Sequence, residues 1–388
     1  MSGPVTLPLT LLAAAGFLSS AGARVIDPLL HVIATDFGTT VPAVSIVVAA
    51  FTLPYGLCQL VLGPLGDRFG KLRLILVMLV CYALATAACA LAGSLPALTL
   101  LRIGAGAASA ALIPVSFAII GDSVPYAERQ VTLSRFLTGM VLAQLLAGPL
   151  GGVFGEYVGW RGVFLLLGAG ALVVAAALGR RLRTWSDRRH AGTDLTLANY
   201  LMLARRPYSR RLLGLTFFDG MLLMGCFPFL APYMHERFGL SYAAVGLVLS
   251  CAGLGALAYT RMAKLLVSRL GEARMMLAGT WLMAAALGAA VLTSHWSALV
   301  PAEIGMGMGA MLFHSVLQAR ATEMLPQARA TGVAAFAFML FLGCSVGALA
   351  IGALIDAVGY GGAFLLDAAA ILALGGVAWL MPGRSAAA

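Results

Sequence analysis

The chain has 388 residues, of which 61% are hydrophobic and 10% are charged, and it carries a formal net charge of +10. Soluble domains are only about half apolar, so this composition excludes an ordinary soluble globular protein. The basic surplus alone would suit a nucleic-acid-binding protein, but its distribution along the chain argues against that class.

Apolar runs long enough to cross a bilayer, about 20 residues each, recur along the whole sequence. We therefore predict an all-α membrane protein with twelve transmembrane helices. No Lys or Arg precedes Arg24 and the first run is long, so we interpret it as a membrane helix and not as a cleavable signal peptide. The predicted helices cover residues 9–35, 43–64, 74–92, 96–120, 134–156, 161–179, 211–235, 242–262, 275–293, 297–319, 331–352 and 361–381.

A hydrophilic, arginine-rich stretch separates the first six predicted helices from the last six. It predicts an N-terminal half over residues 1–180, a basic cytoplasmic linker over 181–210 and a C-terminal half over 211–388. In that topology 21 of the 25 Lys and Arg residues are cytoplasmic, which is the positive-inside pattern. Both termini are then cytoplasmic, and the basic charge faces anionic lipid rather than nucleic acid. The excess of Arg over Lys, 23 to 2, favours a GC-rich bacterium and hence a bacterial inner membrane.

The two halves resemble each other in sequence. At an offset of 201 residues, Gly38 aligns with Gly239 and Gly70 aligns with Gly271. At an offset of 200, VGWRGVFLL in the first half aligns with VGYGGAFLL in the second. This ordered series of matches indicates an internal duplication of a six-helix unit, with both copies starting on the same side of the membrane. Transporters built in this way bind their substrate between the halves, near the middle of the bilayer.

The predicted loop between helices 2 and 3 reads GPLGDRFGKLR, and it resembles the loop signature of the major facilitator superfamily, which is close to G-x-L-x-D-R-x-G-R-K. The matching or turn-forming residues are Gly63, Gly66, Asp67, Arg68, Gly70, Lys71 and Arg73. Together with the duplicated twelve-helix plan, the loop identifies the chain as a member of that superfamily. The resemblance implies that Asp67 binds the positive start of helix 11, near Ala330, when the protein opens outward. The alternative is a solvated loop that only sets the topology.

Predicted helix 5 contains AGPLGG, which resembles the core of the antiporter motif of twelve-helix drug:proton antiporters. Gly148, Pro149, Gly151 and Gly152 match, while Gln144 departs from a further Gly in the family. The glycines make one face smooth for close packing, and we expect the proline to bend the helix. The resemblance implies a seal against small residues of helix 8, such as Gly253 and Gly255. The alternative is the ordinary glycine enrichment of membrane helices.

Ionisable residues inside predicted spans are functional candidates because they are costly in a bilayer. Arg24 and Asp27 lie three apart on one face of helix 1. Burial favours the protonated form of a carboxyl group, whereas an adjacent arginine favours the ionised form. We therefore predict that Asp27 is the proton-coupling acid and that Arg24 tunes it or contacts an anion. The alternative is a permanent ion pair that only stabilises helix 1.

Further candidates come from helices 4, 7 and 10. RIGAG at the start of helix 4 resembles a family signature in which the arginine, here Arg102, is linked to proton movement; the alternative is an arginine that snorkels to the interface.

Asp219 in helix 7 and His314 in helix 10 are the next proton-coupling candidates, since both helices line the cavity in this fold. A hydrogen-bonded structural histidine is the alternative for His314, and we expect Asp367 to pack against a neighbouring helix. The candidates for cavity contacts are Gln59, Tyr55, Gln144, Phe218 and Gln318.

The sequence contains no ATP-binding loop, no metal-ligand spacing and no nucleophile–base arrangement, so we expect a transporter that is not an enzyme and uses a proton gradient, with no cofactor or metal. We predict a monomer that exports small amphipathic compounds, drug-like or metabolic, in exchange for protons. The first alternative is proton-coupled uptake of a nutrient or organic anion, with Arg24 as the anion contact. The second is a membrane sensor or scaffold that no longer transports.

Overall fold

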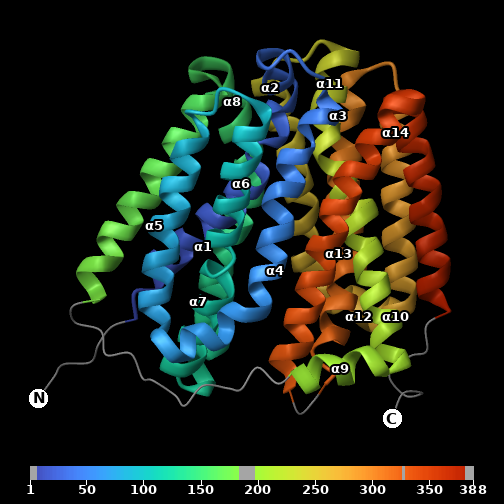
Figure 1. Ribbon diagram of the computed structural model, residues 1–388. Helices are drawn as coiled ribbons and strands as arrows, with labels where there is room; N and C mark the ends of the chain where they lie inside the picture. The colour runs from blue at the N-terminus through green and yellow to red at the C-terminus, as the bar shows by residue number, and fades with distance from the viewer. Residues whose placement is uncertain (1–6, 183–196, 326–327, 381–388) are drawn as a thin grey trace, which may run out of the picture.

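The computed structural model describes residues 7–182, 197–325 and 328–380, and within these ranges it contains helices and no strands (Figure 1). In the first half, helix 1 consists of α1 (Leu9–Arg24), the 3-10 turn η1 (Asp27–Leu29) and α2 (Leu30–Asp36). The elements that follow are α3 (Val41–Val44), α4 (Ile46–Phe69), α5 (Lys71–Cys89), α6 (Leu95–Ser109), α7 (Leu112–Ser123) and α8 (Tyr126–Leu182).

The predicted linker contains α9 (Leu197–Arg205), which lies across the ends of the other helices at the bottom of Figure 1. The second half follows it. Helix 7 consists of α10 (Pro207–Phe218), the π-helix η2 (Asp219–Met224), η3 (Phe227–Phe229) and α11 (Leu230–Phe238). The remaining elements are α12 (Tyr242–Leu292), η4 (Trp296–Ala298), α13 (Leu299–Ala321) and α14 (Arg329–Trp379).

The prediction of twelve spans is confirmed. Nine stretches of the described chain are long and apolar enough to cross a membrane, and three of them have 49 residues or more. Each of these three reverses direction at one glycine with a positive φ: 72° at Gly159, 70° at Gly271 and 73° at Gly359. Because a reversal divides each long element into two crossings, the nine stretches provide twelve membrane-spanning helices.

The duplication seen in the sequence reappears in the backbone. All six positive-φ glycines of the described chain fall into pairs separated by about one repeat length: Gly38 and Gly239, Gly70 and Gly271, Gly159 and Gly359. A left-handed backbone conformation costs other residues roughly 1–2 kcal/mol, so glycine is retained at the same turns in both copies.

An ion pair is also duplicated, with its charges exchanged. In the first half Lys71, after the helix 2–3 turn, contacts Asp122 at the end of α7, with Nζ and Oδ2 2.5 Å apart. In the second half Glu272, after the helix 8–9 turn, accepts a hydrogen bond of 2.9 Å from Arg320 at the end of α13. Lys71 and Glu272 are separated by the repeat offset of 201 residues. The same position therefore carries an ion pair in both halves, with the acidic and basic partners exchanged.

We name the two ends of the bundle by their turns. The linker end contains α9 and the turns at Gly70 and Gly271, and the distal end contains the turns at Gly38, Gly159, Gly239 and Gly359. The described polar contacts that a side chain of one half makes with the other half run from the middle of the bundle to the distal end, while at the linker end the Tyr200 hydroxyl of α9 donates a hydrogen bond of 3.5 Å to the carbonyl oxygen of Leu60 in α4. Thr52 of α4 and Ser345 of α14 share a hydrogen bond of 2.7 Å, Glu156 of α8 accepts one of 2.9 Å from the amide of Ala243, and Nδ1 of His31 lies 3.5 Å from the Glu236 carboxylate. The structure is therefore closed at its distal end.

Candidate functional site

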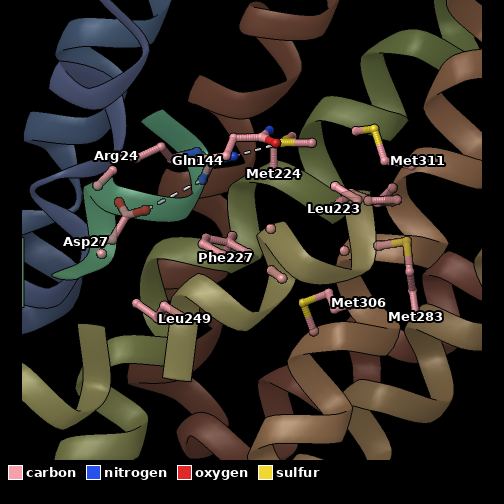
Figure 2. Close-up of a pocket in the computed structure, with 17 residues that line it drawn as sticks. Arg24, Asp27, Gln144, Leu223, Met224, Phe227, Leu249, Met283, Met306 and Met311 are labelled. Atoms are coloured by element: carbon pink, nitrogen blue, oxygen red, sulfur yellow. Dashed lines mark hydrogen bonds and ion pairs between the residues drawn. The ribbon is translucent and has the colours of Figure 1, made fainter. Parts of the chain in front are cut away.

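A cavity lies between the two halves, lined by residues of helices 1 and 5 from the first half and of helices 7, 8, 9 and 10 from the second (Figure 2). Its polar lining, Arg24, Asp27 and Gln144, gathers at one side, and the methionine side chains Met283, Met306 and Met311 lie across from it (Figure 2). The other lining residues are Ala147, Gly148, Leu223, Met224, Phe227, Leu249, Ala252, Gly253, Ala256, Gly307 and Ala310. This cavity occupies the place between the halves at which the duplicated fold predicts a substrate site.

Arg24 and Asp27 meet where helix 1 changes from an α-helix to a 3-10 turn. Pro28 occupies the second position of η1, and it has no backbone N–H to donate to the preceding turn. Nη1 of Arg24 lies 3.6 Å from Oδ2 of Asp27. Nη2 of Arg24 donates a hydrogen bond of 2.9 Å to the sulfur of Met224, and the guanidinium lies 4.8 Å from the ring centre of Phe227. Helix 1 of one half and helix 7 of the other therefore meet at this arginine.

The two charged groups differ in their access to the cavity. The side chain of Arg24 is 31% exposed, whereas that of Asp27 is 2% exposed. Both carboxylate oxygens of Asp27 are buried without a hydrogen-bond partner in the described structure, and the charges of Arg24 and Arg102 act on them. Asp27 is consequently a buried carboxyl group held by charge and not by hydrogen bonds.

Arg102 is buried inside the first half and does not line the cavity. It is 1% exposed, and it donates hydrogen bonds to the carbonyl oxygens of Gly22 in α1, at 3.0 Å, and Val47 in α4, at 3.3 Å. Its guanidinium also lies 4.2 Å from the ring centre of Phe51. The interpretation of Arg102 as a snorkelling arginine is wrong, because the side chain ties three helices together. Its role in proton movement stays a prediction.

Asp219 and His314 form a pair within the second half. Nδ1 of His314 and Oδ2 of Asp219 are 2.7 Å apart, and Asp219 is fully buried. Asp219 begins the π-helix η2, which ends at Met224, the residue that accepts a hydrogen bond from Arg24. Neither member of the pair lines the cavity itself, but one π-helix connects it with the Arg24–Asp27 site.

The predicted cavity contacts are only partly brought together. Gln144 lines the cavity. Tyr55 and Gln59 of α4 interact with each other, and the ring of Tyr55 packs edge-on against Phe341 of the other half, 4.5 Å between centroids. Phe218 and Gln318 are exposed and are not part of the lining.

The glycines of the helix 5 motif lie at helix–helix contacts. A Cβ atom added to Gly148 would lie 2.5 Å from the carbonyl oxygen of Gly246 in helix 8, and Gly152 lies against the carbonyl oxygen of Tyr242. Gly151 faces helix 1, against Val25. The helix continues through Pro149, since its one non-helical residue is Gly159. The expected close packing of the helix 5 glycines against helix 8 is present in the structure, and its role in transport stays a prediction.

Gly253 and Gly255 of helix 8, both expected to pack against helix 5, have different neighbours in the structure. Gly253 packs against Leu145 of helix 5. The expectation for Gly255 is wrong, because this glycine packs against the carbonyl oxygen of Ile304 in helix 10. The two glycines are two residues apart, so they point to different neighbours on the helix.

The loop motif forms the turn from α4 to α5. Gly70 ends α4 with a φ of 96°, Gly66 packs against Leu74, and Lys71 pairs with Asp122. Arg68 and Arg73 are exposed. The side chains of Asp67 and Ala330, and the position of Gly63 relative to its neighbours, lie outside the part of the chain that the structure describes, so the contact of Asp67 with helix 11 stays a prediction.

The sequence analysis missed the methionine-rich wall and one buried acid. Met224, Met283, Met306 and Met311 all line the cavity, and their positions in three helices carry no common spacing in the sequence. Glu303 in helix 10 is 2% exposed, and its Oε2 atom has no hydrogen-bond partner in the described structure. Glu303 could have been identified from the sequence as an acidic residue inside the predicted helix over residues 297–319. Asp367, expected to pack against a neighbouring helix, is buried beside Cys226 of helix 7, and both of its carboxylate oxygens lack a hydrogen-bond partner in the described structure.

Comparisons with known proteins agree with this architecture. The family model of the Major Facilitator Superfamily matches residues 12–210 and 212–387. The uncharacterized MFS-type transporter YwfA of Bacillus subtilis (strain 168) is 25% identical over 245 residues, which are 62% of this chain and 59% of that relative. The alignment thus covers less than two thirds of YwfA.

Two solved structures show the same fold at low identity. A D-xylose–proton symporter aligns with a TM-score of 0.79 at 16% identity, covering 98% of each chain. A bacterial homologue of the human lysosomal transporter Spinster, inward-facing and unoccupied, aligns with a TM-score of 0.75 at 19% identity, covering 95% of this chain and 93% of its own. The family model covers both halves of the chain, and the helices and turns repeat as that fold requires: the protein belongs to the Major Facilitator Superfamily and is a membrane transporter, not an enzyme.

Proposed function

We propose that this protein is a proton-coupled secondary transporter of small amphipathic compounds in a bacterial inner membrane, with its linker end in the cytoplasm. The observation that carries the proposal is the Arg24–Asp27 pair in a cavity between the halves. A buried carboxyl group beside a cation can gain and lose a proton as its surroundings change. No cofactor is needed, because the proton gradient supplies the energy.

Transport proceeds by rocking of residues 1–180 against residues 211–388 around this cavity. Opening the distal end requires breaking the contacts His31–Glu236, Glu156–Ala243 and Thr52–Ser345, all of which join the halves. The loss is offset at the linker end by the contact that the family resemblance assigns to Asp67. Two states of similar energy are what alternating access requires.

Export in exchange for protons is the first candidate for direction. It is supported by the resemblance of the helix 5 motif to that of antiporters and by the position of Gly148 and Gly152 directly against helix 8. Exchange requires that cargo and proton compete for the site, so cargo binding must release a proton from Asp27.

Uptake together with a proton is the second candidate. It is favoured by one observation, the exposure of Arg24 to the cavity while Asp27 is covered. Cotransport requires the opposite linkage, in which cargo binding promotes proton uptake by Asp27.

The test is proton flux in proteoliposomes that contain a trapped pH dye. The added probes are a lipophilic cation (tetraphenylphosphonium), a neutral drug-like amide, a sugar and an aromatic carboxylate. We expect at least one probe to drive proton movement in the wild type and in the control Asp356→Asn, whose acid is exposed, and none to do so in Asp27→Asn. Unchanged flux in Asp27→Asn removes Asp27 as the coupling acid, and the absence of flux with every probe contradicts proton-coupled transport of these classes.

A further inference from the structure

We propose that the cargo is an amphipathic organic anion with an aromatic body, that its acidic group binds Arg24, and that it binds together with a proton on Asp27. This inference rests on the proposed proton-coupled transport at Asp27, takes the second of its two directions, uptake together with a proton, and names the substrate class. It starts from which charged atoms a ligand in the cavity meets.

The charge that the cavity presents to a ligand is positive. Arg24 and Asp27 are the charged residues among the described lining. The guanidinium side chain is 31% exposed, and the carboxylate side chain is 2% exposed with both oxygens buried. A cationic ligand would therefore meet Arg24 before it could reach Asp27, whereas an anion would meet its partner directly.

The guanidinium of Arg24 has unused hydrogen-bonding capacity toward the cavity. It carries five N–H donors, yet its one hydrogen bond given by the described residues goes to the thioether of Met224, a weak acceptor. The distance of 3.6 Å to Asp27 is too long for a hydrogen bond. A ligand carboxylate can accept two parallel N–H bonds from such a group, the strong geometry for arginine.

The rest of the cavity suits a flat apolar body. Phe227 lies beside Arg24, and Met283, Met306 and Met311 form the wall opposite (Figure 2). Thioethers are polarisable and contact aromatic rings favourably, and their flexible chains adapt to different shapes. Gln144 is the uncharged hydrogen-bonding side chain of the described lining, so a sugar, with its many hydroxyl groups, would lose most of its hydrogen bonds on entering.

Anion binding changes the surroundings of Asp27 in one direction. A bound carboxylate competes with Asp27 for Arg24 and places a second negative charge beside it, and both effects favour the protonated form of Asp27. The other charge acting on Asp27 is Arg102 of α6. Arg102 is hydrogen-bonded to Gly22 and Val47 within its own half, so a ligand that binds Arg24 leaves Arg102 in place. The side chains that helices 5 and 7 place in the cavity beside Arg24 and Asp27 are Gln144, Met224 and Phe227. None of these three is an acid or a base that gains or loses a proton. Anion and proton therefore bind cooperatively, and the direction driven by an inward proton gradient is uptake.

The test is isothermal titration calorimetry of purified protein with three naphthalene ligands that differ in one group: 2-naphthoate, 2-naphthamide and 2-naphthylmethylammonium. Each titration is repeated in two buffers of different ionisation enthalpy, which gives the number of protons exchanged. We expect 2-naphthoate to bind at least about tenfold more tightly than the other two, the difference expected for a charge-assisted bidentate contact. About one proton is taken up per bound anion.

Three variants separate the parts of the argument. Arg24→Gln loses at least about tenfold in affinity for 2-naphthoate, Arg24→Lys recovers part of it, and the exposed control Arg261→Gln binds as the wild type does. Asp27→Asn, whose amide resembles the protonated acid, still binds 2-naphthoate but takes up no proton. Thermal unfolding of each variant verifies that it is folded.

The outcomes distinguish this inference from the proposed function. If 2-naphthylmethylammonium binds best and releases a proton that Asp27→Asn does not release, the anion assignment falls and proton exchange at Asp27 stands. If 2-naphthoate binds equally to wild type and Arg24→Gln, the assignment of Arg24 falls. If no ligand exchanges protons in the wild type, the coupling role of Asp27 falls together with this inference.

Discussion

The close contact between Gly148 of helix 5 and Gly246 of helix 8 gives a prediction about the conformational equilibrium. In the variant Gly148→Ala the new Cβ atom would lie 2.5 Å from the carbonyl oxygen of Gly246, whereas ordinary contacts begin at 3.4 Å. The two helices must separate by about 0.9 Å to accommodate it. Overpacking of this kind costs about 1–3 kcal/mol.

The position of the contact determines where this cost acts. Gly148 and Gly246 belong to different halves, so the strain is relieved when the halves part at the distal end, and a state that is already open there does not experience it. Gly148→Ala should therefore shift the equilibrium toward the distal-open state by about 5- to 150-fold, with little effect on the stability of either half.

Two other glycines provide matched controls. A Cβ atom on Gly106 would collide with the backbone of Phe51, which belongs to the same half, so rocking cannot relieve the strain. Gly106→Ala should lower the unfolding temperature without moving the equilibrium. A Cβ atom on Gly288 of helix 9 would have no atom within 4 Å, and Gly288→Ala should change neither property.

The assay is a distance distribution between spin labels on Gly93→Cys and Ser294→Cys, which are exposed at the distal ends of the two halves, in a background without the six native cysteines. The wild type should show mainly the short distance of the closed end, and Gly148→Ala should add a longer one. An unchanged distribution in Gly148→Ala would refute the reasoning, and so would an equal shift in Gly288→Ala, because the effect would then come from alanine in a helix and not from the contact.

Three further predictions concern buried charges and turns. His314→Ala leaves the buried Asp219 without its partner and should lower the free energy of unfolding by about 3–5 kcal/mol; adding Asp219→Asn should recover much of it, and a fully stable single variant would contradict the pairing. Glu272→Ala removes the partner of Arg320 and, since this arginine is 2% exposed, leaves a buried charge unpaired; it should cost a similar amount, about 3–5 kcal/mol, in chemical denaturation. Gly359→Ala forces alanine to a φ of 73° and should cost about 1–2 kcal/mol, seen as a lower unfolding temperature.

Local chemistry explains why so much of the fold could be predicted. A membrane span requires a long apolar run because lipid offers no hydrogen-bond partners, so the twelve crossings are visible in hydropathy alone. Turns with a positive φ require glycine, and Gly159 and Gly359 therefore mark the same reversal in both halves. The duplication and the family resemblance follow from such positions, which depend on neighbours in sequence and not on distant contacts.

The functional site depended on tertiary structure, and the pair formed by Arg24 and Asp27 shows why. Three residues apart, they are predicted on one helical face, and the sequence treats them as equal members of a pair. Packing against helices 5 and 7 buries the carboxylate and leaves the guanidinium in the cavity. Likewise, 95 residues separate Asp219 from His314, and only the packing of helix 7 against helix 10 brings them together.

The sequence by itself determined the class of protein, the number of spans, the duplication and the residue types able to carry charge through a membrane. Tertiary structure alone decided which of these charges faces the cavity, which is covered, and which thioethers form the opposite wall. The physical reason is that hydropathy and backbone conformation are properties of short segments, whereas the exposure of a side chain is set by helices that come from all over the chain.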